Sequence, residues 1–505
     1  MRRMPSPNTD DIDGLKATIA AQSAELYAQA LLIEKLKLQI AKQNRFRFGA
    51  RSEGLDQLDL MIEGNERDLA PSPSPESEAP LTATGQAKRQ ALPDHLPRET
   101  SVHSPDVTGC SVCGKPMRKM SEDVREILDF VPGRFVVRRH VCEKLSCRDC
   151  GVIVEGALPT MPIEKGAPGP GLLAHVLVSK FADHLPFYRQ SAIYARDGVD
   201  VSRSTMAGWV TKMAALLAPL AARIEAHVLA GDAIHTDDTP IPVLDPGRGR
   251  TKTGRYWTHV RDERPRASLM PPAVFYRYSP NRKAEHPRDH LKHYAGFLHA
   301  DGYAGYEQLY QTEVIAEVAC MAHIRRKLFD VHKATGSPVA EEALSRIARL
   351  YAVERRIRGE PPDERRSVRQ ADAKPLFEDL RAWLQAVLPS LPPRGELAKA
   401  MRYAIARMKR LEIYLEDGRL EIDNNAAERS VRGIGLGRKN YLFAGADSGG
   451  ESGAVLYTLV ETAKLNSVDP QAWLTQVIAT IADHPMKRID ELLPWNFKPM
   501  SFCHA

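Results

Sequence analysis

"DAIHTDDTPIPVL", residues 232–244, decides the fold class, because it opens a run of strand candidates. Four more candidates follow it, at residues 254–262, 273–280, 296–306 and 314–332. The first three are separated by loops and the later ones by helices, which is a pattern of mixed sheets. The succession predicts an antiparallel meander that continues into parallel βα units, and therefore an α/β domain.

Two aspartates stand at strand ends in this region, Asp237 after "AIHT" and Asp301 after "GFLHA". On adjacent strands, two carboxylates can share a divalent cation, because Mg²⁺ is held by one or two carboxylates plus substrate phosphates. A third acid from a helix would complete a two-metal site that acts on a phosphodiester. Glu428 in "DNNAAER" is the candidate, with Asn424 as the cap of its helix. Each acid taken alone also has an ordinary structural explanation. An Asp at a strand end is commonly a turn former, and a Glu beside an Arg on a helix commonly belongs to a solvated surface.

Asp238 directly follows Asp237, so the first position has two candidates. Alternation along a strand points the two side chains to opposite faces, and only one of them can reach a metal. We expect Asp237 to be the ligand and keep Asp238 as the alternative.

Basic residues near Glu428 are candidates for DNA contacts. Arg429 and Arg432 lie one helical turn apart and can face a phosphate backbone from beside the acid. Arg438 and Lys439 continue the basic series along the same segment.

A second DNA-contacting segment is predicted upstream, where "DGVDVS" separates two helices. The first helix ends near Arg196, and Ser202 can cap the second. This is the layout of a helix-turn-helix, whose second helix would present Arg203 and Ser204 to a major groove. A plain helical hairpin fits the same pattern, and the two interpretations stay open.

Two Cys-x-x-Cys pairs, "CSVCGKP" at 110–116 and "CRDCGVI" at 147–153, have the spacing of a zinc knuckle. "RFVVRRHVC" between them alternates like a strand. The 33 residues that separate the pairs exceed the usual ribbon spacing, so we expect a hairpin insert. Disulfides do not suit a cytoplasmic chain. The predicted ligands of one structural Zn²⁺ are Cys110, Cys113, Cys147 and Cys150, whereas Cys142, Cys320 and Cys503 are not expected to bind it.

The first helix carries a heptad seam from Ile12 to Gln43 that three Gln residues interrupt. A dimerising coiled coil and an amphipathic helix packed on its own chain both fit this seam. "PSPSPESEAP", residues 71–80, is too poor in apolar residues to pack and indicates a linker.

Composition bounds the remaining possibilities. The chain has 505 residues, which is more than a domain with a single hydrophobic core usually contains, so several domains are expected. No apolar run reaches the roughly 18 residues of a membrane span. The net charge is +6, and the first residues lack a signal peptide, so a cytoplasmic protein is expected. Between Asp301 and Glu428, residues 335–420 have helical spacing and predict an insertion domain. Its Arg-rich face fits either DNA contacts or a solvated surface.

Five motifs together resemble the transposases of the insertion sequence 66 family of bacterial mobile elements: "HTDDTPIPVL", "LHADGYAGY", "CMAHIRRKLFD", "IDNNAAERSVRGIGLGRKNYLFAGADSGG" and "RIDELLPWNF". The resemblance implies a ribonuclease-H-like domain whose Asp, Asp, Glu triad binds two Mg²⁺ ions. Asp237, Asp301 and Glu428 match its first, second and third places. The family usually has Asp-Glu-Thr where this chain has Asp237, Asp238 and Thr239.

A Cys-x-x-His signature follows the second acid, in which Cys320 and His323 match the family. We expect these two residues to have a supporting role. The resemblance also implies DNA as the partner, both as element ends and as target, and helper proteins from the same element.

The expected protein is therefore multidomain α+β, located in the bacterial cytoplasm with the nucleoid, and self-associating through its N-terminus. Water would attack at the element end, and the freed 3′ hydroxyl would then attack target DNA. Two alternatives are an inactive DNA-binding descendant and a general nuclease of the same fold. The expected domains are a coiled coil (1–50), a linker (51–100), a zinc-binding domain (101–165), a helical DNA-binding segment (166–230), the catalytic core (231–334 and 421–482), the helical insertion (335–420) and a tail (483–505).

Overall fold

The computed structural model describes residues 133, 135–137, 144–146, 153–155, 160–163, 168–245, 247 and 249–498. The predicted coiled coil of residues 1–50, the linker of residues 51–100 and all four predicted zinc ligands lie outside the described residues. The helices and strands below belong to one compact unit that includes residues 141–505.

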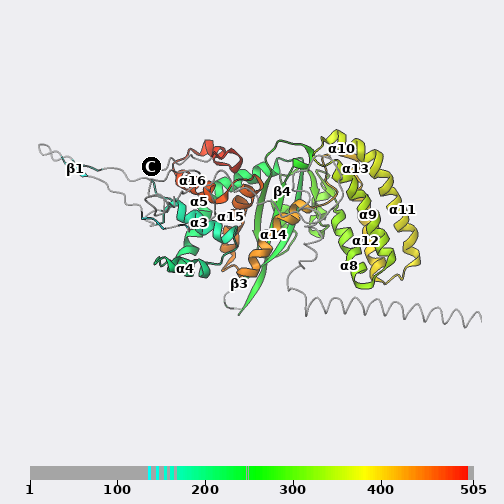
Figure 1. The fold of residues 1–505 in the computed structure, drawn as a ribbon, viewed down its shortest axis with the longest axis horizontal. Coiled ribbons are helices and arrows are strands. Elements are labelled where there is room, and N and C mark those ends of the chain that lie inside the picture. The colour runs from blue at the N-terminus through cyan, green and yellow to red at the C-terminus, as the bar shows by residue number, and fades with distance from the viewer. Residues whose placement is uncertain are drawn as a thin grey trace, which may run out of the picture. The chain divides into compact units, whose positions relative to one another are not determined.

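A five-stranded mixed sheet forms the centre of this unit, with the order β5-β4-β3-β6-β7 (Figure 1). Strands β3, β4 and β5 are antiparallel, whereas β6 pairs with β3, and β7 with β6, in parallel. The predicted meander followed by parallel units is thus confirmed. The strands are β3 (Ala233–Asp245), β4 (Arg250–Arg261), β5 (Ala273–Ser279), β6 (Gly296–His299) and β7 (Ile315–Val318).

Helices from both ends of the described chain cover the β5 side of the sheet. Thr458 and Thr462 accept the backbone N–H groups of Tyr276 and Val274 at 3.0 and 3.2 Å, so their helix is hydrogen-bonded directly to β5. Figure 1 shows the other helices gathered around it. They are α3 (Pro170–Phe181), α4 (Phe187–Arg196), α5 (Arg203–Leu229), α15 (Asp447–Leu465), which carries the two threonines, and α16 (Pro470–Thr480).

The helix α5 is long and apolar enough to cross a membrane by length and composition alone. Its apolar residues Met206, Met213, Leu217, Leu220 and Ile224 are instead buried inside the protein. The helix packs against α15 and β5, which is the environment of a core helix.

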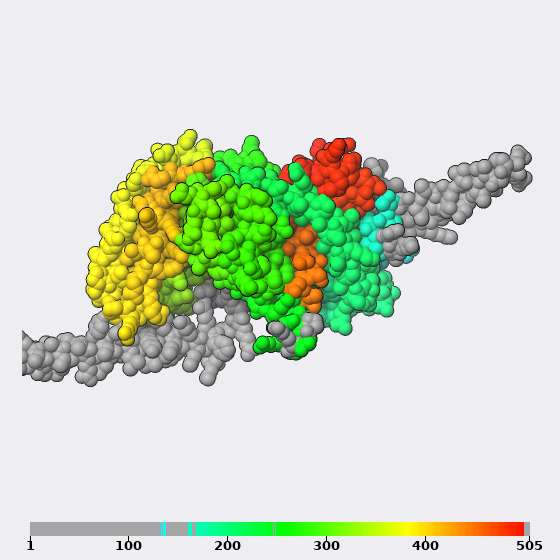
Figure 2. Space-filling model, turned by 180° about the vertical axis from the view of Figure 1, so that it is seen from behind, coloured from blue at the N-terminus to red at the C-terminus, as the bar shows by residue number. Residues whose placement is uncertain are grey.

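Residues between β7 and the last core helices form a helical lobe with its own buried apolar core. The backbone N–H of Met321 donates to Ile422 O at 3.0 Å, so the chain enters and leaves this lobe at one place. Figure 2 shows the lobe in yellow beside the sheet in green. Its helices are α8 (Met321–Thr335), α9 (Pro338–Arg356), α10 (Pro362–Val368), a π-helical turn (Arg369–Ala373), α11 (Lys374–Val387), α12 (Glu396–Leu411) and α13 (Ile413–Glu416).

Two arginines of the predicted Arg-rich face are buried within this lobe. Arg369 pairs with Glu354 at 2.6 Å and also donates to the backbone carbonyl of Tyr414 at 3.0 Å. Arg365 pairs with Glu421 at 2.6 Å. These two side chains are therefore neither a solvated surface nor a DNA-contacting one, because they hold the segment that returns from the lobe to the core.

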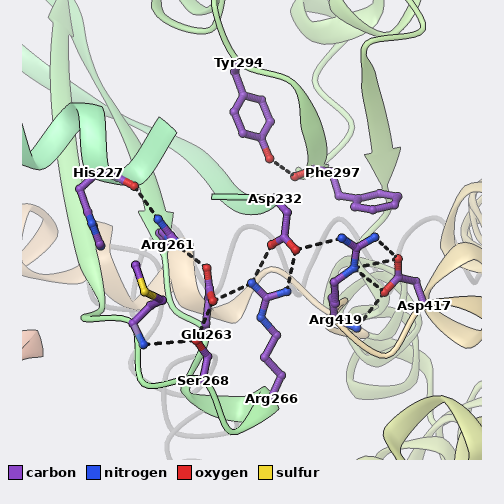
Figure 3. Close-up of polar contacts among 11 residues, drawn as sticks. His227, Asp232, Arg261, Glu263, Arg266, Ser268, Tyr294, Phe297, Asp417 and Arg419 are labelled. Carbon is purple, nitrogen blue, oxygen red and sulfur yellow. Dashed lines mark hydrogen bonds and ion pairs between the residues drawn. The ribbon is translucent and has the colours of Figure 1, made fainter. Parts of the chain in front are cut away.

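A polar network at the start of β3 also attaches this returning segment (Figure 3). Asp232 accepts hydrogen bonds from Arg266 at 2.6 Å and from Arg419 at 2.9 Å. Arg419 also pairs with Asp417 at 2.6 Å. Burial alone would raise the pKa of Asp232, but the two arginines outweigh it and lower that pKa.

The remaining elements are short. The strand expected within residues 134–142 is not found at Phe135–Val137, which have no regular structure; β1 (Lys144–Ser146) instead pairs with β2 (Ile153–Glu155) in an antiparallel hairpin. The segment that joins these two strands contains the second Cys pair. The other helices are α6 (Glu285–His290), α7 (Glu307–Tyr310), α14 (Asn425–Asn440) and the 3-10 turns Arg264–Arg266, Ala304–Tyr306, Leu388–Ser390, Met486–Leu492 and Pro494–Asn496.

Candidate active site

The parallel pairing of β3 with β6 brings the first two candidate acids to the same level of the sheet. His235 is the partner of His299, and each candidate acid comes two residues later, Asp237 on β3 and Asp301 just past β6. Asp237 lies inside β3, which continues to Asp245, and not at the strand end that the sequence predicts. Both acids come just past the last pair of residues that joins β3 to β6.

Asp237 and Asp238 have different surroundings. Asp238 pairs with Arg255 at 2.9 Å and with Arg282 at 2.7 Å, and its side chain is only 3% exposed. Asp237 has carboxylates for neighbours: burial, followed by the charges of Asp301 and Glu428, raises its pKa well above the usual value. Asp238 is therefore neutralised by cations, whereas Asp237 belongs to an acidic cluster.

The turn after β6 fixes the position of Asp301. One oxygen of its carboxylate accepts the backbone N–H of Tyr303 at 2.8 Å. Gly302 has φ of 84°, and a Cβ there would meet the guanidinium of Arg407, so this turn requires glycine. Arg282 lies 3.8 Å from the other carboxylate oxygen.

Glu428 lies in the first turn of α14, with its side chain 11% exposed. Arg326 of α8 donates to Oε2 at 2.8 Å, and His323 Nδ1 lies 3.6 Å from Oε1. Burial, and then the charge of Arg326, lowers the pKa of His323 to about 4. A neutral imidazole and a guanidinium therefore face the two oxygens of this carboxylate.

Asn424 links α14 to β3, and this differs from the helix cap that the sequence predicts. Its side chain makes no capping hydrogen bond. The amide instead donates to Thr236 O at 2.8 Å, and its oxygen contacts His235 Nδ1 at 3.1 Å. Since the amide nitrogen is the donor to Thr236, His235 Nδ1 carries the proton that Asn424 accepts. A fully buried side chain thus joins the start of the Glu428 helix to the residue before Asp237.

The two histidines of "AIHT" and "FLHA" extend this link to β6. His235 and His299 stack with their ring centroids 4.2 Å apart. His299 Nε2 accepts the backbone N–H of Glu421 at 3.1 Å. Burial lowers the pKa of His235 to about 4 and that of His299 well below the usual value, so both rings are neutral. Sequence reasoning missed this pair, although each histidine stands two residues before a candidate acid.

The candidate DNA contacts differ in exposure. Arg429, Arg432 and Lys439 are exposed on α14, whereas Arg438 is half-buried and donates to Pro240 O on β3. Ser202 caps α5 as predicted, accepting the N–H of Thr205 at 3.1 Å, and Arg203 and Ser204 are exposed beside it. The helices α4 and α5 have the boundaries expected of the predicted pair.

Comparison with known proteins agrees with this architecture along the chain. The model of the IS66 transposase family matches residues 165–452, and the IS66 C-terminal element matches residues 458–495. The zinc-finger binding domain of transposase IS66 matches residues 108–151, which supports a structural zinc. A model described as "Transposase C of IS166 homeodomain" matches residues 35–100.

Full-length relatives occur in Sinorhizobium fredii. "Uncharacterized protein y4hP" is 39% identical over 497 residues, which cover 93% of this chain and 90% of the relative. "Uncharacterized protein y4qI" is 36% identical over 531 residues, covering 97% and 98%. The family matches and these relatives confirm the resemblance seen in the motifs. The chain therefore belongs to the IS66 family of transposases and is a transposase-like DNA-binding protein.

Proposed function

We propose that this protein is an active Asp-Asp-Glu transposase, which cleaves the ends of its insertion sequence and joins the freed 3′ ends to target DNA. The observation that carries the proposal is the placement of three acids from distant parts of the chain. Asp237 and Asp301 come just past the pairing of β3 with β6, and Glu428 lies on the helix α14, which packs on β3. The charges of Asp301 and Glu428, after burial, raise the pKa of Asp237. Gathering like charges in a partly buried place opposes their ionisation and is typical of catalytic or metal sites.

The fold proposed for this centre is ribonuclease-H-like, interrupted by the lobe. Its support is a sheet whose first three strands are antiparallel and whose last two are added in parallel. Two of the acids come just past the pairing of the neighbouring strands β3 and β6, Asp237 within β3 and Asp301 after β6, and the third comes from a helix that packs on β3 and β4. We propose residues 231–334 and 421–482 as the two parts of this core and 335–420 as the insertion.

The donor set of Asp237, Asp301 and Glu428 fits magnesium. Hard cations prefer carboxylate oxygens, and the raised pKa of Asp237 reflects negative charge that a cation would neutralise. Two Mg²⁺ ions held there would supply Lewis-acid stabilisation of the phosphate charge and a water of lowered pKa.

The residues around the acids are proposed to set their positions. Arg326 and His323 fix the direction of the Glu428 carboxylate, because each faces one of its oxygens. The exposed side chains of Arg429 and Arg432, which lie one helical turn apart, are placed to neutralise DNA phosphates beside the reacting strand. Positioning of this kind is a large part of phosphoryl-transfer catalysis.

The parts outside the core are proposed to assemble the protein on DNA. Residues 1–50 would form a dimerising coiled coil, 51–100 a linker, and 101–165 a zinc-binding domain held by Cys110, Cys113, Cys147 and Cys150. Residues 166–230 would contact element ends through Arg203 and Ser204, and 483–505 form a tail. Helper proteins from the same element would act with it.

The test compares four variants on labelled element-end DNA with Mg²⁺. Glu428→Gln and Asp237→Asn should each lose roughly 10²-fold or more of the cleavage rate, because a neutral amide is a poor ligand for a hard cation. Glu451→Gln, an exposed position on α15, is the control and should keep the wild-type rate. Asp238→Asn should keep cleavage, because the carboxylate of Asp238 is already paired with two arginines.

Each alternative has its own signature in this experiment. Wild-type protein that binds element ends without metal-dependent cleavage would be an inactive descendant. Cleavage with no preference for element ends would indicate a general nuclease. Wild-type rates in Glu428→Gln would refute the assignment of the third acid.

A further inference from the structure

Three side chains of mixed donor chemistry converge beside the acidic cluster. Cys320 Sγ, a nitrogen of His323 and a carboxylate oxygen of Glu428 all lie within 4.8 Å of one another. His323 Nδ1 and Glu428 Oε1 are 3.6 Å apart. Two ligands of one tetrahedral zinc are separated by about 3.4 Å, given bonds of about 2.0–2.3 Å. The distance between His323 Nδ1 and Glu428 Oε1 is therefore close to the distance between two ligand atoms of one zinc ion.

Local structure explains why the sulfur and the imidazole share one side. Cys320 is the N-cap of α8, and His323 stands three residues later, so their side chains lie on one face of the first turn. The backbone N–H of Asn424 donates to Cys320 Sγ at 3.2 Å, which directs the sulfur toward the start of α14. Burial, followed by the charges of Glu428 and Asp423, raises the pKa of the Cys320 thiol well above its usual value, so the bound cation itself must displace the thiol proton.

The state of the imidazole suits a ligand. The Nδ1 of His323 is buried and has no hydrogen-bond partner among the described residues. A buried polar atom without a partner calls for an explanation, and an ion that it would bind is one.

We propose that Cys320, His323 and Glu428 form a binding site for a thiophilic divalent cation of the zinc class, distinct from the predicted Cys-x-x-Cys site. Thiolate, imidazole and carboxylate together select zinc-like ions, whereas magnesium prefers oxygen alone. Three protein ligands leave the fourth position of a tetrahedral ion open. Binding releases the thiol proton of Cys320 to solvent, because the thiolate is the ligand.

Glu428 belongs to both this site and the proposed catalytic triad, so the two cations compete for it. Zinc bound by Cys320 and His323 would hold Glu428 away from Asp237 and Asp301, and would therefore inhibit magnesium-dependent cleavage. This consequence rests on the proposed function, whereas binding itself does not.

The experiment is a Co²⁺ titration of the full chain, purified with zinc in its predicted finger. Wild type should bind one additional equivalent with a thiolate-to-cobalt charge-transfer band. Cys320→Ser should lose that band, and His323→Gln should weaken Co²⁺ binding about tenfold or more. Cys503→Ser, a cysteine of the C-terminal segment, is the matched control and should keep both. No additional equivalent in wild type, or an unchanged band in Cys320→Ser, would overturn the proposal.

Two measurements keep the outcomes separate. Near-ultraviolet circular dichroism and the unfolding midpoint show whether Cys320→Ser is folded, and His323→Gln provides a second variant if it is not. The titration uses no DNA, so a chain that never cleaves can still bind cobalt. Where cleavage is present, added Zn²⁺ should inhibit wild type and spare Cys320→Ser; equal inhibition of both would refute the competition.

Discussion

At the scale of single residues, the side chains around the candidate acids contact partners that lie far away in the sequence, as the hydrogen bond between Asn424 and Thr236 O does. The sequence singled out Asp237, Asp301 and Glu428 by their motifs, and the structure brings their charges together. It misassigned Asn424, which has the preferred residue type of a cap but bonds across to β3. Glu421 belongs to no motif, yet it pairs with the buried Arg365. Such partners are separated by 56 to 188 residues in sequence, and local patterns contain no information about them.

The role of Asn424 can be measured directly. Asn424→Ala should destabilise the protein by about 1–3 kcal/mol, because it leaves the buried carbonyl of Thr236 and the N–H of His235 without their partner. It should also lower cleavage, since a small displacement of Glu428 costs roughly 10²-fold in rate. Denaturant unfolding and the cleavage assay, run on the same protein, check both.

Asn440→Ala at the other end of α14 is the control for this variant. Its side-chain contacts are long, at 3.5 Å, so its loss should change neither quantity appreciably. Equal effects of the two substitutions would mean that Asn424 does not position the helix.

At the scale of elements, strands were predictable because their apolar segments are bounded by loops and helices. All five strands of the sheet overlap the expected segments, although β4 begins four residues before its segment and β3 ends one residue after its own. Their order agrees with the lengths of the connections. Of the strand expected at 134–142, the structure describes only Phe135–Val137, which have no regular structure.

The zinc domain gives a prediction at this scale. One zinc per chain should resist a weak chelator, and Cys147→Ser should lose it, because three remaining ligands hold the metal far less tightly. Elemental analysis after gel filtration measures the content. Cys142→Ser should retain the metal, and a zinc content unaffected by Cys147→Ser would rule out the predicted ligand set.

At the scale of the whole molecule, ion pairs attach the lobe to the sheet. Asp232 at the start of β3 binds Arg419, 187 residues away, and Glu317 of β7 binds Arg407 of α12 at 2.7 Å. The sequence predicted that residues 335–420 are helical, but their attachment depends on tertiary pairs that composition does not reveal. The number of arginines in this segment predicted an exposed basic face, but the side chains of Arg365 and Arg369 are buried.

The Asp232 network predicts a pH dependence of stability. Its folded pKa lies below the ordinary 3.8, so the ionised carboxylate stabilises the fold above that value and loses this effect as pH falls below it. Asp232→Asn should therefore lower the free energy of unfolding by about 1–2 kcal/mol at pH 6. The difference from wild type should be smaller at pH 3, which lies below the ordinary pKa of the carboxyl group. Urea unfolding at both pH values tests this, and a constant difference would contradict it.

The hydrogen bond between Met321 N and Ile422 O has an evolutionary consequence. Because the lobe begins and ends at one point, its length can change without moving the strands or the start of α14. Insertions and deletions among residues 338–416 are therefore the changes that diverging copies of such a gene can accumulate most freely. The acids on either side, Asp301 and Glu428, can stay in register while the number of residues between them drifts.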